Sequence, residues 1–108
     1  MAHCPPEQLG DLADVLAALR CWEGVSEVKP GIFYLGRTPF LHFHLKDGRR
    51  WADARDGADW GEPIEIPLGS RPRQRAAFLA TVSAYYRSTA RAVGAKRPAP
   101  QKSALKRR

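Results

Sequence analysis

Residues 39–55, PFLHFHLKDGRRWADAR, predict two antiparallel strands joined by a tight turn at Asp47-Gly48. An Asp-Gly pair between two runs of strand-forming residues is one of the strongest local signals of a β-hairpin. A two-residue turn makes Lys46 and Arg49 neighbours across the hairpin. Every pair further along the two strands is then fixed as well.

The expected register gathers four polar or aromatic side chains on one face of the hairpin. His44 lies opposite Trp51, and His42 lies opposite Asp53. All four share a face because side chains two apart on a strand point the same way. The opposite face is apolar, and with the preceding strand it is expected to form the core: Ile32, Tyr34, Leu41, Phe43, Ala52 and Ala54.

The strand before the hairpin, residues 32–35, is expected to pair so that Leu35 lies opposite Phe40. This register adds Phe33, Leu35 and Phe40 to the histidine face. Large apolar side chains on a solvent-facing sheet surface usually mark a contact surface. We therefore expect this face to contact the long loop after the hairpin, a second copy of the chain or a ligand. Phe33, Leu35 and Phe40 are the candidate interface residues.

A helix is predicted at the start of the chain. Pro5, Pro6 and Glu7 suit a first helical turn, and the helix is expected to continue to about residue 22. Its buried stripe is predicted by leucines at helical spacing: Leu9, Leu12, Leu16 and Leu19. Asp11 and Asp14 fall outside this stripe and are expected to face water.

A second helix is expected from Ser70, a good N-cap residue, to Gly94. Two more short strands, residues 25–29 and 64–66, complete the pattern. The order predicts an α+β domain: an antiparallel meander of three to four strands flanked by an N-terminal and a C-terminal helix. Residues 1–94 are assigned to this single domain.

Charge is distributed unevenly along the 108 residues. Residues 1–70 hold seven Lys and Arg against eleven Asp and Glu, whereas residues 71–108 hold eleven Lys and Arg and no acid. Such a basic segment attracts nucleic acid or an acidic protein through salt-sensitive contacts. Residues 95–108 also contain two prolines and few apolar side chains, which predicts a disordered tail. The candidate polyanion contacts are Arg87, Arg91, Lys96, Arg97, Lys102, Lys106, Arg107 and Arg108.

Two chemical interpretations of the histidine face stand beside a purely structural one. A carboxylate next to an imidazole fixes its tautomer and raises its basicity, so His42 and Asp53 suggest acid–base chemistry. Histidines two apart on a strand can also hold a metal ion, with Asp53 as a third ligand beside His42 and His44. His3 and Cys4 lack the spacing of a metal motif. Nothing in the sequence requires a cofactor.

The stretch KPGIFYLGRTPFLHFH, followed by GRRWADAR, resembles small bacterial hypothetical proteins with a similar Phe-Leu-His-Phe-His run and an Ala-Asp-x-Arg sequence. The resemblance covers about residues 29–90 and implies a shared small α+β fold, but it transfers no catalytic residue. No apolar run reaches the ~20 residues that a membrane span needs. No signal-peptide pattern is present either, so a cytoplasmic protein is expected.

The leading hypothesis is a small cytoplasmic binding domain that self-associates through its Phe, His and Trp face. One alternative is a metal-dependent or acid–base enzyme that uses His42, His44 and Asp53. The other is a nucleic-acid accessory protein that acts through the basic C-terminal third.

Overall fold

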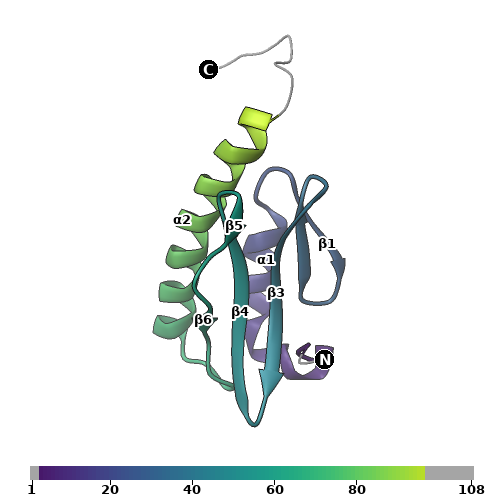
Figure 1. Ribbon diagram of the computed structural model, residues 1–108. Helices are drawn as coiled ribbons and strands as arrows, with labels where there is room; N and C mark the ends of the chain where they lie inside the picture. Colours follow the sequence, from purple (N-terminus) through teal and green to yellow (C-terminus); the bar gives the residue numbers. More distant parts are fainter. Residues whose placement is uncertain (1–2, 97–108) are drawn as a thin grey trace.

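The computed structural model describes residues 3–96 of the chain (Figure 1). Two short 3-10 turns, Pro6–Gln8 and Gly10–Leu12, lead into helix α1 (Ala13–Arg20), and helix α2 (Pro72–Lys96) closes the described part. The strands between the helices are β1 (Val25–Lys29), β2 (Ile32–Leu35), β3 (Thr38–Lys46), β4 (Arg49–Asp56), β5 (Asp59–Trp60) and β6 (Ile64–Glu65). The predicted α+β class is confirmed, with more strands than expected.

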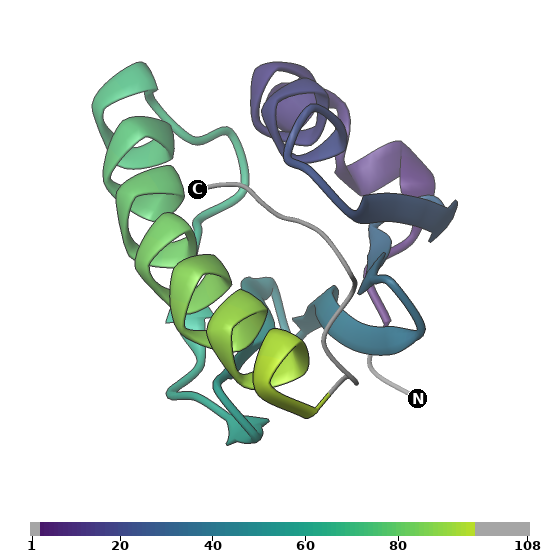
Figure 2. The same cartoon turned by 90° about the horizontal axis from the view of Figure 1, so that it is seen from above.

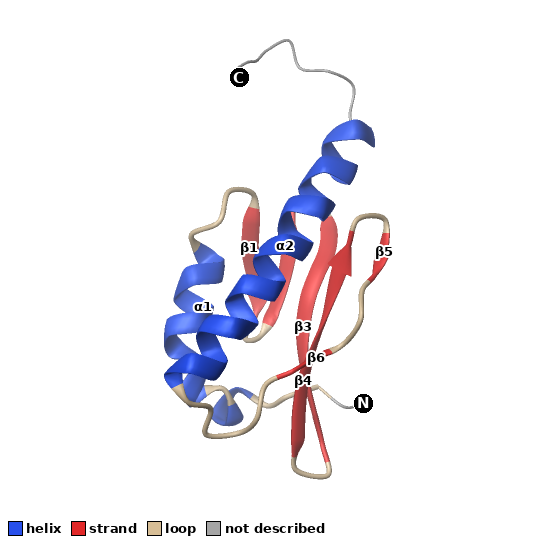
Figure 3. Cartoon of the chain, turned by 90° about the vertical axis from the view of Figure 1, so that its left-hand side faces the viewer, coloured by secondary structure: helices blue, strands red, loops and turns tan. Residues whose placement is uncertain are grey.

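The sheet is antiparallel, with the strand order β1-β2-β3-β4-β5. β6 also pairs with β4, so β5 and β6 follow each other along the same edge of that strand. Figures 2 and 3 show both helices on one side of the sheet. Within the described chain, helices therefore cover only one of the two sheet faces. No helix in this part of the chain is long and apolar enough to cross a membrane.

The register predicted for the β3–β4 hairpin is confirmed. Lys46 pairs with Arg49, and the pairing continues without a shift to Leu41 and Ala54. The turn residues Asp47 and Gly48 have φ angles of 54° and 78°. Both central residues are thus left-handed, which is the geometry of a type I′ turn and explains why Asp-Gly occupies it.

The register predicted between the second and third strands is wrong. Leu35 pairs with Thr38, not with Phe40, because the turn between the strands has only two residues. A register shift then lies beside Phe33, since Phe33 pairs with Leu41 while the next β2 residue pairs with Pro39. Phe40 is the extra residue of this bulge, and a bulge allows two consecutive side chains to turn inward.

This bulge overturns the proposed interface. Phe33 and Phe40 are fully buried and Leu35 is nearly so, all three in the core beneath the helices. Ile32 and Tyr34, which were expected in the core, are only half-buried. A self-association surface made of Phe33, Leu35 and Phe40 is therefore excluded by their burial.

The helices differ from expectation mainly at their ends. The predicted leucine stripe is buried as expected, but Pro6–Gln8 and Gly10–Leu12 form 3-10 turns and the α-helix begins only at Ala13. Gly94 does not end the second helix, because α2 continues to Lys96. The predicted tail, residues 95–108, lies outside the described residues apart from positions 95 and 96.

The largest fully buried side chain is that of Arg50 in β4. It points inward with Ala52 and Ala54, in keeping with the alternation of the strand. A guanidinium has five N–H donors, and Arg50 makes five hydrogen bonds. Two reach the carboxylate of Asp11, each at 2.8 Å. The other three reach the backbone carbonyl oxygens of Gln8, Ile66 and Pro67.

The expectation that Asp11 faces water is therefore wrong. Besides Arg50, its carboxylate accepts hydrogen bonds from the backbone N–H and the hydroxyl of Ser70, at 2.8 and 2.7 Å. The hydrogen bonds from Arg50 hold the pKa of Asp11 well below its usual range. Asp11 thus connects the N-terminal turns to β4 and to the start of α2.

We expect Asp11→Ala to lower the free energy of unfolding by about 3–5 kcal/mol, because the guanidinium of Arg50 would stay buried without its carboxylate. The pKa of Asp11 is lower in the folded than in the unfolded chain. Its stabilising contribution is therefore complete above the ordinary aspartate pKa of about 4 and is lost as the pH falls toward the folded-state pKa. Urea unfolding across this pH range measures both effects.

Asp14→Ala is the matched control for this experiment. The carboxylate of Asp14 bonds to Arg75 at 3.0 Å but is 61% exposed, and exposed ion pairs contribute little to stability. A much smaller loss is expected. Equal losses for the two variants would contradict the role of Asp11.

Candidate metal centre

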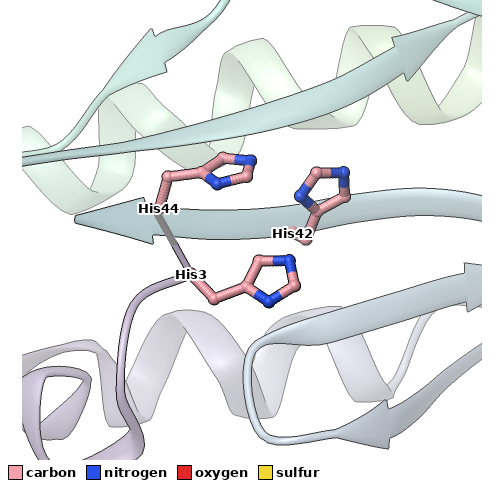
Figure 4. Close-up of side chains that lie close together, drawn as sticks. All are labelled: His3, His42 and His44. Atoms are coloured by element: carbon pink, nitrogen blue, oxygen red, sulfur yellow. The ribbon is translucent and has the colours of Figure 1, made fainter. Parts of the chain in front are cut away.

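All three histidines of the chain lie together on the sheet face that the helices leave uncovered (Figure 4). His42 and His44 extend from the same side of β3, and His3 approaches from the N-terminal segment. A β-bridge between His3 and His44 holds this segment against β3. A hydrogen bond of 3.0 Å from the N–H of Cys4 to the carbonyl oxygen of Phe43 extends the pairing.

The three rings are close enough to share one ion. Their centroids are 4.5 Å apart for His42 and His44, 5.6 Å for His3 and His44, and 5.9 Å for His3 and His42. One nitrogen from each ring lies within 4.8 Å of the other two. Nitrogens bound to one tetrahedral zinc ion at ~2.0–2.1 Å are about 3.4 Å apart. Shifts of about 1 Å or less in each ring therefore suffice for coordination.

Three imidazole nitrogens in the cluster are buried without a hydrogen-bond partner: Nδ1 of His42 and both Nδ1 and Nε2 of His44. Buried polar atoms are rarely left unpaired in folded proteins. Nε2 of His44 lies 3.0 Å from Oδ2 of Asp53, which is close enough for a hydrogen bond once the two groups align. The two Nδ1 atoms then remain free to act as metal ligands.

Two tryptophans border the cluster. Trp51 of β4 stacks on His44, with ring centroids 5.2 Å apart, and Trp60 of β5 meets His42 edge-on at 5.0 Å. Trp60 is itself 43% exposed. The histidines are thus bordered by aromatic rings at the surface of the protein.

Burial lowers the pKa of His42 below its ordinary value, and the charges of His44 and His3 lower it further, whereas Asp53 opposes the shift. A lower pKa leaves the imidazole of His42 neutral at neutral pH. A neutral imidazole is the form that binds a metal ion.

The predicted pairings on this face are confirmed at the level of the backbone. His42 lies opposite Asp53, and His44 lies opposite Trp51. The carboxylate of Asp53, however, contacts His44 diagonally rather than His42 across the strand pair. Such diagonal neighbours are within reach of long side chains.

His3 takes the place that the sequence interpretation gave to Asp53. The ligand atoms that converge belong to His3, His42 and His44, and Asp53 is not one of them. The sequence offered one signal for this, because His3 is the only other histidine in the chain. Its distance from β3 along the sequence hid the contact.

The predicted polyanion contacts are only partly described. Arg87 and Arg91 lie exposed on α2, and Lys96 is the last residue of that helix. The remaining candidates lie outside the described residues: Arg97, Lys102, Lys106, Arg107 and Arg108. Nucleic-acid binding therefore stays a prediction.

Comparisons with protein-family models, curated proteins and solved structures find no match for this chain. The geometry of the three histidines is therefore the basis for a functional proposal.

We expect the imidazole of His42 to titrate below the ordinary histidine value of about 6.5 in an NMR pH titration. The pKa of His42 is lower in the folded than in the unfolded chain. The contribution of neutral His42 to the free energy of unfolding should therefore be fully present above that ordinary value and be lost as the pH falls through the folded-state pKa. Trp60→Ala should move the midpoint upward, since it exposes the ring to water. A wild-type midpoint at or above the ordinary value would contradict this account.

Proposed function

We propose that this protein binds one divalent transition-metal ion, with zinc as the reference ion, through His3, His42 and His44. The observation that carries the proposal is the convergence of all three histidines of the chain within 4.8 Å at their ligand atoms. The proposal keeps the binding-domain class expected from the sequence. The expected binding partner changes, because a metal ion at the three histidines takes the place of a second copy of the chain at an apolar interface.

The ligand chemistry favours zinc, copper or nickel over calcium or magnesium. Imidazole nitrogen suits the borderline metals, whereas calcium and magnesium prefer oxygen ligands. The unpaired Nδ1 atoms of His42 and His44 are the natural first ligands. His3, which is exposed, adds the third from the N-terminal segment.

Asp53 supports the proposed site as a hydrogen-bond partner of the ligand His44. A metal-bound histidine commonly donates its other ring N–H to a carboxylate, which fixes the ring orientation and strengthens the ligand. The pair formed by Nε2 of His44 and Oδ2 of Asp53, at 3.0 Å, has the separation for this role. Binding through Nδ1 and donation through Nε2 together give each unpaired nitrogen of His44 a partner.

Isothermal titration of the intact, metal-free protein with zinc at about pH 7 tests the proposal. One equivalent is expected to bind, and His3→Ala, His42→Ala and His44→Ala should each weaken binding by at least about 100-fold. Asp53→Asn should cost about 10–100-fold, as outer-layer partners do. With free zinc at about 100 times the dissociation constant, the free energy of unfolding should rise by about 2.7 kcal/mol.

Cys21→Ser is the matched control. Cys21 is the exposed one of the two free cysteines, so its loss should leave zinc affinity unchanged if the histidines hold the ion. The proposal fails if folded histidine variants bind zinc as tightly as the wild type.

A further inference from the structure

A cavity of about 440 Å³ lies at the end of the sheet where β3 begins and β4 ends, beside the C-terminal half of α2. Figure 1 shows where these elements lie in the fold. The turn between β2 and β3, the turn between β4 and β5, and α2 contribute its walls. The lining includes two arginines, a threonine and three small apolar residues: Arg37, Arg55, Thr38, Ala58, Ala92 and Val93. None of the described residues that line the cavity is acidic.

Arg55 lines this cavity and has no acidic partner among the described residues. Its Nε donates to the carbonyl oxygen of Pro39 at 2.8 Å, and its Nη1 donates to that of Ala58 at 2.9 Å. The guanidinium carbon lies 4.6 Å from the centre of the Trp60 ring. These partners are all neutral. They use two of the five N–H donors of a guanidinium, which leaves three for a ligand.

The other partly or fully buried arginines differ from Arg55 in this respect. Among residues 3–93, whose exposure is described, three arginines are buried or half-buried: Arg50, Arg55 and Arg75. Arg50 pairs with Asp11 and Arg75 pairs with Asp14, but no carboxylate of the described chain lies within ion-pair distance of Arg55. Charges removed from water are normally paired.

The acids nearest in sequence do not fill this role, and Asp53, two residues away in β4, pairs with His44 instead. Asp56 and Asp59 face each other across β4 and β5 and are both exposed. Neither lines the cavity nor pairs with Arg55. No acid of the described chain therefore supplies a counter-charge to Arg55.

We propose that this cavity binds a small phosphate monoester with an apolar substituent. Arg55 and Arg37 would receive the phosphate, since a guanidinium donates two parallel hydrogen bonds to phosphate oxygens. The hydroxyl of Thr38 adds a further donor. Ala58, Ala92 and Val93 provide an apolar wall for the substituent. The site uses none of the three histidines, although Trp60 contacts both Arg55 and His42, and the proposal does not require a bound metal.

The probe for this site is phenyl phosphate, followed by backbone amide NMR of the intact chain at about 0.15 M salt, where exposed charges are screened. Saturable shifts are expected at Gly36, Thr38, Gly57 and Ala58. Arg37→Gln and Arg55→Gln should each weaken binding at least about tenfold, the loss of one charge-assisted hydrogen bond. Phenol, which has the ring but no phosphate, should not bind.

Arg49→Gln is the matched control, because Arg49 is 73% exposed and already paired with Glu65 at 3.2 Å. The affinity of the Arg49→Gln variant for phenyl phosphate should equal that of the wild type. Arg37 is exposed and forms no ion pair within the described chain, so Arg37→Gln should stay folded even if Arg55→Gln does not. Absence of saturable shifts, or equal weakening by Arg37→Gln and Arg49→Gln, would overturn the proposal.

Discussion

The ion pair between Arg50 and Asp11 is the constraint on which the rest of the structure depends. A guanidinium in a hydrophobic core is costly unless every donor is satisfied, and here all five donors have partners. Those partners come from the N-terminal turns and from the segment between β6 and α2. The N-terminal turns, β4 and the segment between β6 and α2 must therefore adopt one mutual arrangement. Apolar packing alone would specify this arrangement less strictly.

This constraint also determines where the histidines meet. Arg50 holds Gln8 and Asp11 to β4. The C-terminal end of the segment that precedes Gln8 is therefore fixed beside the sheet. From there the chain runs back along β3, where Cys4 pairs with Phe43 and His3 reaches the two strand histidines. The candidate metal centre is in this sense a product of the N-terminal anchor as well as of the hairpin.

Local chemistry explains what the sequence allowed and what it did not. The Asp47-Gly48 turn and the alternation beside it were enough to predict which residues of β3 and β4 face each other, because a type I′ turn fixes the register. The bulge at Phe40 could not be predicted, since no turn residue marks it and the ring of Phe40 packs against Tyr86, which lies far away in the sequence. Arg50 and His3 were missed for a similar reason: their partners lie far away in the sequence and only the folded chain brings them together.

Alternate residues of β4 have different roles, because one set packs in the core and the other borders the candidate binding sites. Its even-numbered positions, Arg50, Ala52 and Ala54, are buried and hold the layers together. Its odd-numbered positions, Trp51, Asp53 and Arg55, are only half-buried and border the metal centre and the arginine-lined cavity. Substitutions at Trp51, Asp53 and Arg55 can therefore change which ligand is bound, while Arg50, Ala52 and Ala54 preserve the fold. The strand offers a place where binding specificity can diverge, in evolution or in a designed library, at little risk to folding.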